Sequence, residues 1–218
     1  PPATDKPSVP GWGFWPQHPQ GWKAYLDGQI ARTKQGNIDI VFLGDSITQG
    51  WTENDGRAVW AETFAGRKAV NYGIGGDSTR QVLYRIDAGI LDGISPRYVV
   101  INIGTNNLYG DHNAGSDEEI ADGVLAVVAR VREKTPQAKI VLCAILPRQN
   151  DYFCNRIANV NRLVKAAADD ARVIWLDMTD DFLRAPGKIR TELYHPDEVH
   201  LVNKGYIVWR DRLIKVID

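Results

Sequence analysis

The segment VFLGDSITQGW, residues 41–51, contains the pattern from which the fold can be worked out. An apolar run reaches Leu43 and stops at Gly44-Asp45-Ser46, after which small and polar residues follow. Apolar side chains at consecutive positions are typical of a strand that is buried on both faces. A serine directly after such a strand can cap a helix, form a turn or act as a nucleophile, and the other segments have to distinguish these roles.

Four more short apolar runs follow, and longer segments with helical periodicity separate them. The predicted strands are Ile38–Leu43, Lys68–Tyr72, Tyr98–Ile103, Lys139–Ala144 and Arg172–Leu176. The predicted helices lie near residues 22–35, 53–64, 78–91, 116–134, 155–169 and 203–216. This alternation predicts a single α/β domain over residues 1–218, in which helices cover both faces of a five-stranded parallel sheet.

Residues 1–21 are rich in Pro, Gly and Trp and are expected to form an irregular, aromatic-rich arm. Its aromatic side chains either pack on the body or line a rim, and packing is the preferred interpretation. They are Trp12, Phe14, Trp15 and the neighbouring Trp22. A Pro-rich start without Met suggests a secreted or periplasmic protein, with a cytoplasmic location as the alternative.

Charge and cysteine content exclude several classes of protein. The formal net charge is -1 and there is no basic run, so we expect no nucleic-acid partner. No apolar stretch approaches the ~18 residues of a membrane span, so we expect none. Cys143 and Cys154 can form a disulfide in an oxidising compartment, or Cys143 can be a small apolar strand residue.

The residues that follow each strand are the candidates for a site. In a parallel sheet, ligands bind beyond the carboxyl ends of the strands. The segments found there are Gly44–Ser46, Asn71–Ser78, Gly104–Asn107, Leu146–Arg148 and, before the last helix, Tyr194–His200. Together they provide a hydroxyl, glycine amides, a side-chain amide, a carboxylate and an imidazole.

These groups are the ones that acyl transfer requires. Ser46 becomes an effective nucleophile when a base takes its proton, and His200 can be that base. Asp197 precedes His200 by three residues, so one turn can orient its carboxylate toward the imidazole. The N–H groups of Ser46 and a glycine, with the amide of Asn106, can stabilise an oxyanion. This chemistry needs no cofactor and no metal.

Four blocks of the sequence, in order, resemble those of the GDSL or SGNH hydrolases. They are Gly44-Asp45-Ser46, Gly76, Gly104-Thr105-Asn106 and Asp197-x-x-His200. Within that family, NYGIGGDSTRQVLYRI and IGTNN most resemble the catalytic subunits of the platelet-activating-factor acetylhydrolases. The resemblance implies a three-layer, flavodoxin-like fold, and association as a homodimer is an option because the related subunits dimerise.

The resemblance also implies roles for individual residues. Ser46 would be the nucleophile, His200 the base and Asp197 its partner. Gly76, which directly precedes Asp77 as the family's glycine precedes an Asp, would join Ser46 and Asn106 in the oxyanion hole. Of the two adjacent asparagines, we expect Asn107 to be the left-handed turn residue.

The substrate is expected to be an ester with a short acyl group, namely acetyl, on a carbohydrate or another small molecule. The alternative substrate is a lipid or phospholipid ester, which would be hydrolysed by the same mechanism. The seven tryptophans make a sugar-bearing substrate plausible. The candidates for contact with substrate are Asp45, Trp51, Tyr109 and Arg148, for which capping, packing or salt bridges are competing interpretations.

Two functions of other classes stay open. His195, Asp197 and His200 can be read as the ligands of a metal-dependent phosphodiesterase, which would leave Ser46 and Asn106 unexplained. A sugar-binding module without catalytic activity is the second, and it has no need of Ser46, Asp197 and His200 together. The nucleophile elbow G-x-S-x-G of the α/β-hydrolases is only half present, because position 48 is Thr.

Overall fold

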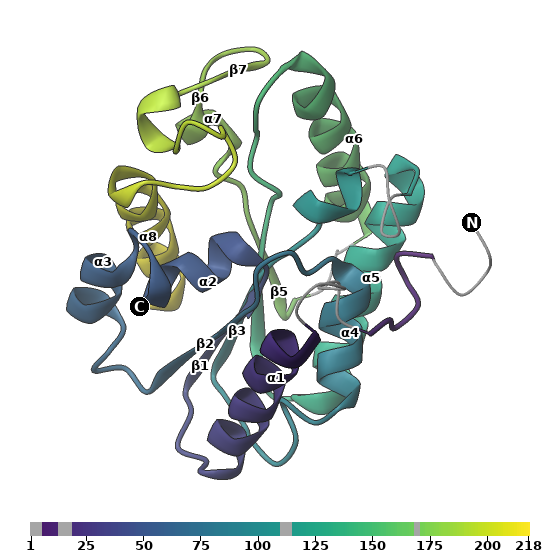
Figure 1. Cartoon of the computed structure of the whole chain (residues 1–218), viewed down its shortest axis with the longest axis vertical. Coiled ribbons are helices and arrows are strands. Elements are labelled where there is room, and N and C mark those ends of the chain that lie inside the picture. Colours follow the sequence, from purple (N-terminus) through teal and green to yellow (C-terminus); the bar gives the residue numbers. More distant parts are fainter. Residues whose placement is uncertain (1–5, 13–18, 110–114, 168–170) are drawn as a thin grey trace.

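A five-stranded parallel sheet forms the centre of the molecule (Figure 1). The computed structural model describes residues 6–12, 19–109, 115–167 and 171–218. The strands are β1 (Ile40–Gly44), β2 (Ala69–Gly73), β3 (Tyr98–Asn102), β4 (Lys139–Cys143) and β5 (Val173–Leu176). Their order, β2-β1-β3-β4-β5, is that of flavodoxin-like proteins. The predicted α/β fold with five parallel strands is therefore confirmed.

Helices cover both faces of this sheet and make three layers (Figure 1). One face carries α1 (Pro19–Lys34), α4 (Thr79–Asp87), α5 (Asp117–Lys134) and α6 (Asp151–Ala167). The other carries α2 (Ser46–Glu53), α3 (Arg57–Thr63), α7 (Thr179–Phe182) and α8 (Asn203–Ile217). In the part of the chain that the structure describes, no helix combines the length and the apolar character that a bilayer crossing requires.

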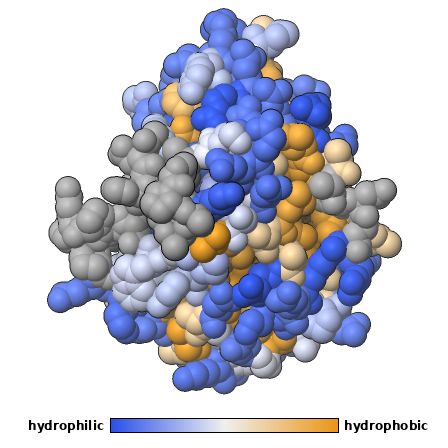
Figure 2. Space-filling model, turned by 90° about the vertical axis from the view of Figure 1, so that its right-hand side faces the viewer, coloured by the Kyte–Doolittle hydropathy of each residue, from blue (hydrophilic) through white to orange (hydrophobic). Residues whose placement is uncertain are grey.

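Side chains of each strand alternate between the two cores, as the pleat requires. On β1, Val41 and Leu43 contact the core under α1, α4, α5 and α6, whereas Ile40 and Phe42 contact the core under α2, α3 and α8. The outer surface on the side that carries α5 is mostly hydrophilic, and apolar residues occupy smaller areas of it (Figure 2). On α5, the apolar residues Val124, Val127, Val128 and Val131 are buried, so this helix is amphipathic.

Two of the helices begin with capping boxes that are visible in the sequence. The Ser116 side chain accepts a hydrogen bond from the Glu119 N–H, and the Glu119 side chain accepts one from the Ser116 N–H. Ser78 and Gln81 make the same reciprocal pair at the start of α4. Such caps satisfy N–H groups that the first helical turn leaves without partners.

The region after β1 differs from the prediction of one helix near residues 53–64. A helix that the sequence did not predict, α2, already starts at Ser46, and a turn at Asn54–Gly56 separates it from α3. A glycine, Gly50, lies within this helix. The glycine is needed because a Cβ at this position would collide with the Tyr206 hydroxyl.

The remaining short elements lie between the main ones. They are the 3-10 helices η2 (Thr105–Leu108) and η3 (Thr191–Leu193) and the hairpin of β6 (Leu183–Ala185) and β7 (Lys188–Ile189). The sequence did not predict this hairpin. Both cysteines are buried free thiols, so the disulfide alternative is wrong and Cys143 is an apolar strand residue.

The described part of the N-terminal arm packs on the body, as preferred from the sequence. The Trp12 ring lies against the rings of Trp22 and Tyr84, with centroid separations of 5.2 and 5.1 Å. Trp22 is fully buried, and it already belongs to α1, which starts at Pro19. Phe14 and Trp15 lie outside the described residues.

Candidate active site

Ser46 is the first residue of α2 and lies directly beyond the carboxyl end of β1. Asp45 is the helix cap, because its Oδ1 accepts a hydrogen bond of 2.9 Å from the Ile47 N–H. The helix lies close to β2, where a Cβ on Gly73 would collide with the backbone of Gln49. Ser46 therefore sits at a helix N-terminus, where N–H groups lack helical partners and negative charge is favoured.

Asp197 and His200 share a turn before α8. Asp197 Oδ1 accepts hydrogen bonds of 2.9 Å from the N–H groups of Val199 and His200. Its Oδ2 lies 2.6 Å from His200 Nδ1. Partial burial tends to raise the pKa of Asp197, but these hydrogen bonds outweigh it and hold the pKa at about 2.

The imidazole of His200 joins this turn to the helix that starts with Ser46. Its Nε2 lies 2.9 Å from Ser46 Oγ, across 154 positions of sequence. With the ring proton on Nδ1, facing Asp197, Nε2 is free to accept the hydrogen bond of the Ser46 hydroxyl. The structure thus brings Ser46, His200 and Asp197 into one hydrogen-bonded chain at the edge of the sheet.

The glycine-rich loop after β2 lies beside this chain. Gly76 has a φ of 79°, a left-handed conformation that favours glycine. The loop is held on both sides of Gly76, because the Gly75 N–H donates to Gln49 Oε1 at 2.7 Å and the Asp77 N–H donates to the Ile74 carbonyl at 3.2 Å. The N–H of Gly76 has no acceptor among the residues that the structure describes, so it is available to a ligand.

Asn106 lies in η2 and reaches the same loop. Its Nδ2 donates a hydrogen bond of 2.9 Å to the carbonyl of Asp77, which places the amide next to Gly76. Asn107 is buried and bonds to Thr79, with its Oδ1 accepting from the backbone and its Nδ2 donating to the hydroxyl. Asn107 is absent from the residues with positive φ, so the expectation that it is a left-handed turn residue is wrong.

A buried ion pair between Arg85 and Asp77, which was not predicted from the sequence, fixes the loop that carries Gly76. Arg85 of α4 donates to Asp77 Oδ2 at 2.8 Å, and both side chains are 0% exposed. The guanidinium also donates to the carbonyls of Gly44 at 3.0 Å and Tyr72 at 2.7 Å. Burial raises the pKa of Asp77 to about 6, against the opposing effect of Arg85. One side chain thus links the end of β1, the end of β2 and the loop of Gly76.

Asp45 was expected to contact substrate, and the structure corrects this. Its side chain is fully buried and caps α2, while its Oδ2 has no hydrogen-bond partner among the described residues. Burial raises the pKa of Asp45 to about 7, although the Ile47 N–H and the charges of His200 and Arg148 oppose the shift. Asp45 therefore affects the site through helix capping and charge.

Trp51 was also expected to line a substrate pocket, and this too is wrong. The ring is 0% exposed and contributes to the core under α8. Its centroid lies 4.8 Å from that of Tyr206 and 5.2 Å from that of Trp209. Its position in α2, five residues after Ser46, turns the side chain toward the core.

Tyr109 and Arg148 lie together, with different access to solvent. Tyr109 is 45% exposed, so a substrate can reach its ring. Arg148 is 1% exposed and stacks against that ring, with Cζ 4.4 Å from the centroid. The expectation of a direct substrate contact is therefore wrong for Arg148, whose guanidinium is covered.

The ligand set of the metal-dependent alternative is not assembled. His195 Nε2 pairs with Asp55 Oδ2 at 3.1 Å, whereas Asp197 pairs with His200. Within residues 6–12, 19–109, 115–167 and 171–218, no three His, Cys, Asp or Glu side chains gather in a way that could hold a metal ion. The three residues of the phosphodiesterase hypothesis therefore do not form one ligand set in the described part of the chain.

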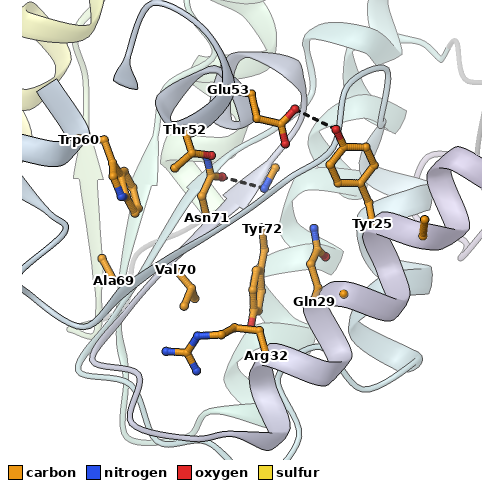
Figure 3. A pocket seen from close by; sticks show the side chains of 13 residues that line it. Tyr25, Gln29, Arg32, Thr52, Glu53, Trp60, Ala69, Val70, Asn71 and Tyr72 are labelled. Carbon is orange, nitrogen blue, oxygen red and sulfur yellow. Dashed lines mark hydrogen bonds between the residues drawn. The ribbon is translucent and has the colours of Figure 1, made fainter. Parts of the chain in front are cut away.

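A separate groove of about 520 Å³ runs along the edge strand β2 (Figure 3). Tyr25 and Arg32 of α1 line one side, and Glu53 and Trp60 line the other. The Tyr25 hydroxyl donates to Glu53 Oε2 at 2.8 Å. Residues 71–73, the start of one candidate segment, line this groove, but none of the predicted catalytic, oxyanion-hole or substrate-contact residues does.

Comparison with known proteins gives relatives with a consistent description. The chain is 38% identical to platelet-activating factor acetylhydrolase IB subunit alpha1 of Bos taurus over 189 residues, 85% of this chain and 77% of that protein. It is 34% identical to the alpha2 subunit of Rattus norvegicus over 188 residues, 85% and 78% of the two chains.

A solved structure has the same fold. A GDSL-like lipase of Bacteroides thetaiotaomicron superimposes with a TM-score of 0.71 over 90% of this chain and 96% of its own, at 20% identity. Residues 42–208 match the model of the GDSL-like Lipase/Acylhydrolase family. This range includes every residue of the hydrogen-bonded chain and of the glycine loop. The chain therefore belongs to the GDSL-like lipase/acylhydrolase family and is an ester hydrolase.

Proposed function

We propose that this ester hydrolase is a serine esterase that works through an acyl-enzyme on Ser46. His200 takes the hydroxyl proton as Oγ attacks the ester carbonyl. The protonated imidazole then gives that proton to the leaving alcohol. Water, deprotonated by the same imidazole, releases the acid and restores Ser46.

The observation that carries this proposal is the hydrogen-bonded chain of Ser46, His200 and Asp197. The 2.9 Å separation of Ser46 Oγ and His200 Nε2 is within reach for proton transfer. Asp197 orients the ring and stabilises its protonated form, and its low pKa keeps it ionised while it does so. All three residues meet at the carboxyl edge of the sheet, where ligands bind in this kind of fold.

The oxyanion of the tetrahedral intermediate is proposed to bind the N–H groups of Ser46 and Gly76 and the Nδ2 of Asn106. Three observations support this. Ser46 is at a helix N-terminus, the Gly76 N–H has no acceptor among the described residues, and Asn106 lies beside Gly76. Such donors are effective when they are fixed before the charge develops.

The acyl group is proposed to be acetyl, because the relatives with 34–38% identity are named acetylhydrolases. For the alcohol half, the same names favour an acetylated phospholipid over a carbohydrate. The tryptophans give a sugar little support, since Trp22, Trp51 and Trp209 are fully buried. Association of two copies and export from the cell stay predictions.

Hydrolysis of p-nitrophenyl acetate, butyrate and octanoate tests the mechanism. We expect acetate to be preferred, a chelator to have no effect, and Ser46→Ala to lower kcat by at least about 10⁴-fold. Ser95→Ala, at an exposed position in a loop, is the matched control and should keep wild-type activity. Full activity of Ser46→Ala, or loss of activity with the chelator, would contradict the proposal. Acetylated glycerophospholipid and acetylated xylose then distinguish the two alcohol halves.

A further inference from the structure

Arg148 is a buried guanidinium that no carboxylate of the described residues contacts directly, although the charges of Asp45 and Asp197 act on it from a distance. In the described part of the chain no Asp or Glu forms an ion pair with it, and its Nε has no hydrogen-bond partner. The rings of Tyr109 and Phe153 enclose it, with centroids 4.4 and 4.8 Å from Cζ. Burial of an unpaired charge is unfavourable, and contacts with aromatic rings offset only part of that cost.

On one side, Arg148 bonds to the segment that carries Asn106. Its Nη1 donates to Thr105 Oγ1 at 3.0 Å, and Thr105 directly precedes Asn106. Its Nη2 donates to the hydroxyl of Tyr109, the residue that directly follows η2. The guanidinium therefore contacts this segment on both sides of Asn106 in the sequence, at the first residue of η2 and at the residue that follows it.

On the other side, Arg148 bonds to a neighbour that holds the turn of Asp197 and His200. Its Nη2 donates to Gln149 Oε1 at 3.2 Å. The Gln149 backbone N–H donates to the Glu198 carbonyl at 3.2 Å, and its Nε2 donates to the Asp197 carbonyl at 3.4 Å. Arg148 and Gln149 thus form a bridge between two segments of the site that are about ninety positions apart in the sequence, residues 105–109 and 197–200.

Two residues at this bridge have an unfavourable backbone conformation, which the surrounding contacts hold in place. Gln149 has a φ of 51° and Glu198 a φ of 57°, both in the left-handed region. Non-glycine residues there cost on the order of 1 kcal/mol each and persist when neighbouring contacts fix them. Next to it, the Tyr194 hydroxyl donates to the carbonyl of Pro147, the residue before Arg148, at 2.6 Å. This bond also ties the bridge to the stretch that leads into Asp197.

We propose that Arg148 is a positioning residue that acts through Thr105 and Gln149. It holds the amide of Asn106 and the imidazole of His200 at the separation that one substrate carbonyl requires. The inference rests on the proposed function, in which Asn106 binds the oxyanion and His200 transfers the proton. Displacement of such groups by about 1 Å can cost about 10²-fold in rate. Substrate affinity is unaffected, because the guanidinium is covered by the two rings.

Steady-state kinetics of Arg148→Met and Arg148→Lys test the proposal. Met retains the length but removes the donors, and we expect kcat to fall about 10²-fold with KM within about threefold. Lys can bond to one of the two partners but not fork between both, so it should recover about tenfold over Met. Arg130→Met, which removes an ion pair between α5 and α4, is the control and should keep wild-type kcat. A kcat of Arg148→Met within about twofold of wild type, or Lys no better than Met, would overturn the proposal.

A second variant covers the case in which Arg148→Met fails to fold. Gln149→Ala leaves the guanidinium in place and removes the two side-chain hydrogen bonds of Gln149, to Arg148 and to the Asp197 carbonyl, while the backbone bond to Glu198 stays. We therefore expect kcat to fall about tenfold with an unchanged melting temperature. If the double variant Arg148→Met, Gln149→Ala folds, its loss of kcat should be smaller than the product of the two single losses, because both substitutions interrupt the same bridge. Multiplying losses, or an unchanged kcat of Gln149→Ala, would contradict the bridge. If Ser46→Ala is inactive while both bridge variants are normal, only this inference fails, whereas an active Ser46→Ala refutes the proposed function itself.

Discussion

The two sides of the candidate site differ in how far they are buried. On the side of the nucleophile and the glycine loop, Asp45, Asp77 and Arg85 are all 0% exposed. On the side of the base, the side chains of Asp197 and His200 are 49% and 42% exposed. The first side is fixed by a network inside the protein, and the second by one turn at the surface.

This difference matches the tasks proposed for the two sides. Oxyanion donors stabilise a developing charge most when they are rigid and shielded, since they do not have to reorganise. A general base has to exchange protons with water and with the leaving alcohol, which requires access. Variants in the buried network of the first side should therefore mainly change stability, and variants on the exposed side should mainly lower activity.

Among the variants that compare the two sides, the largest effect is expected for Asp197→Asn on the exposed side. Asn cannot hold His200 in the tautomer that accepts the Ser46 proton, so kcat should fall about 10³- to 10⁴-fold. The melting temperature should change little, because the replaced side chain is half-exposed. Kinetics and thermal unfolding of one preparation check both parts. A large loss of stability, or a kcat within tenfold of wild type, would remove the contrast between the sides.

Arg85→Met should produce the opposite pattern. It leaves the Asp77 carboxylate buried without its cation, which costs about 3–5 kcal/mol of unfolding free energy. Urea unfolding measures this loss. The double variant Arg85→Met, Asp77→Asn should recover part of it, because no charge is left unpaired. If Arg85→Met lowers the free energy of unfolding by less than about 1 kcal/mol, the buried network does not stabilise this side of the site.

Asn106→Ala should lower kcat by about 10²- to 10³-fold, the typical cost of losing one oxyanion donor. KM should stay near the wild-type value, since the amide acts on the charged intermediate. The separation of kcat from KM is the informative measurement. A raised KM with normal kcat would instead make Asn106 a substrate-binding residue.

The smallest effect is expected from the pH dependence of Asp45. The pKa of about 7 in the folded protein lies above the ordinary value of about 4 in the unfolded chain. The stability that Asp45 contributes is thus complete below about pH 4 and is lost as the pH rises through about 7. Asn cannot ionise, so Asp45→Asn should gain on the order of 2 kcal/mol relative to wild type between pH 5 and pH 8. A difference that is independent of pH would contradict the raised pKa.

The sequence predicted the strands well because their signal is local. Each observed strand starts within two residues of its predicted start. A short run of β-branched apolar residues between polar segments is typical of a strand that helices cover on both faces, so the run itself marks the strand. The chain from Ser46 through His200 to Asp197 could also be predicted, because strand ends converge in this fold. The start of α2 was missed although capping was one of the interpretations of Asp45, because the predicted helix was placed only from about residue 53.

What the sequence could not predict depends on the direction of side chains. Trp51 and Arg148 each follow a strand closely in the sequence, as the site residues do. The direction of α2 turns Trp51 into the core, and the rings of Tyr109 and Phe153 cover Arg148, so neither side chain reaches solvent. Arg85 was missed although a signal existed. It lies among Val82, Leu83 and Ile86 on the buried face of α4, and an arginine among apolar positions of a helix requires a buried partner.

The most direct test of the acyl-enzyme is to find the acyl group itself. The protein is mixed with p-nitrophenyl acetate, quenched in acid within a turnover and digested, and its peptides are analysed by mass spectrometry. If the two sides meet as proposed, the acetyl group is found on Ser46, it accumulates in a variant slowed at Asp197, and Ser46→Ala shows none. An acetyl group on another residue, or turnover by Ser46→Ala at the wild-type rate, would contradict the mechanism.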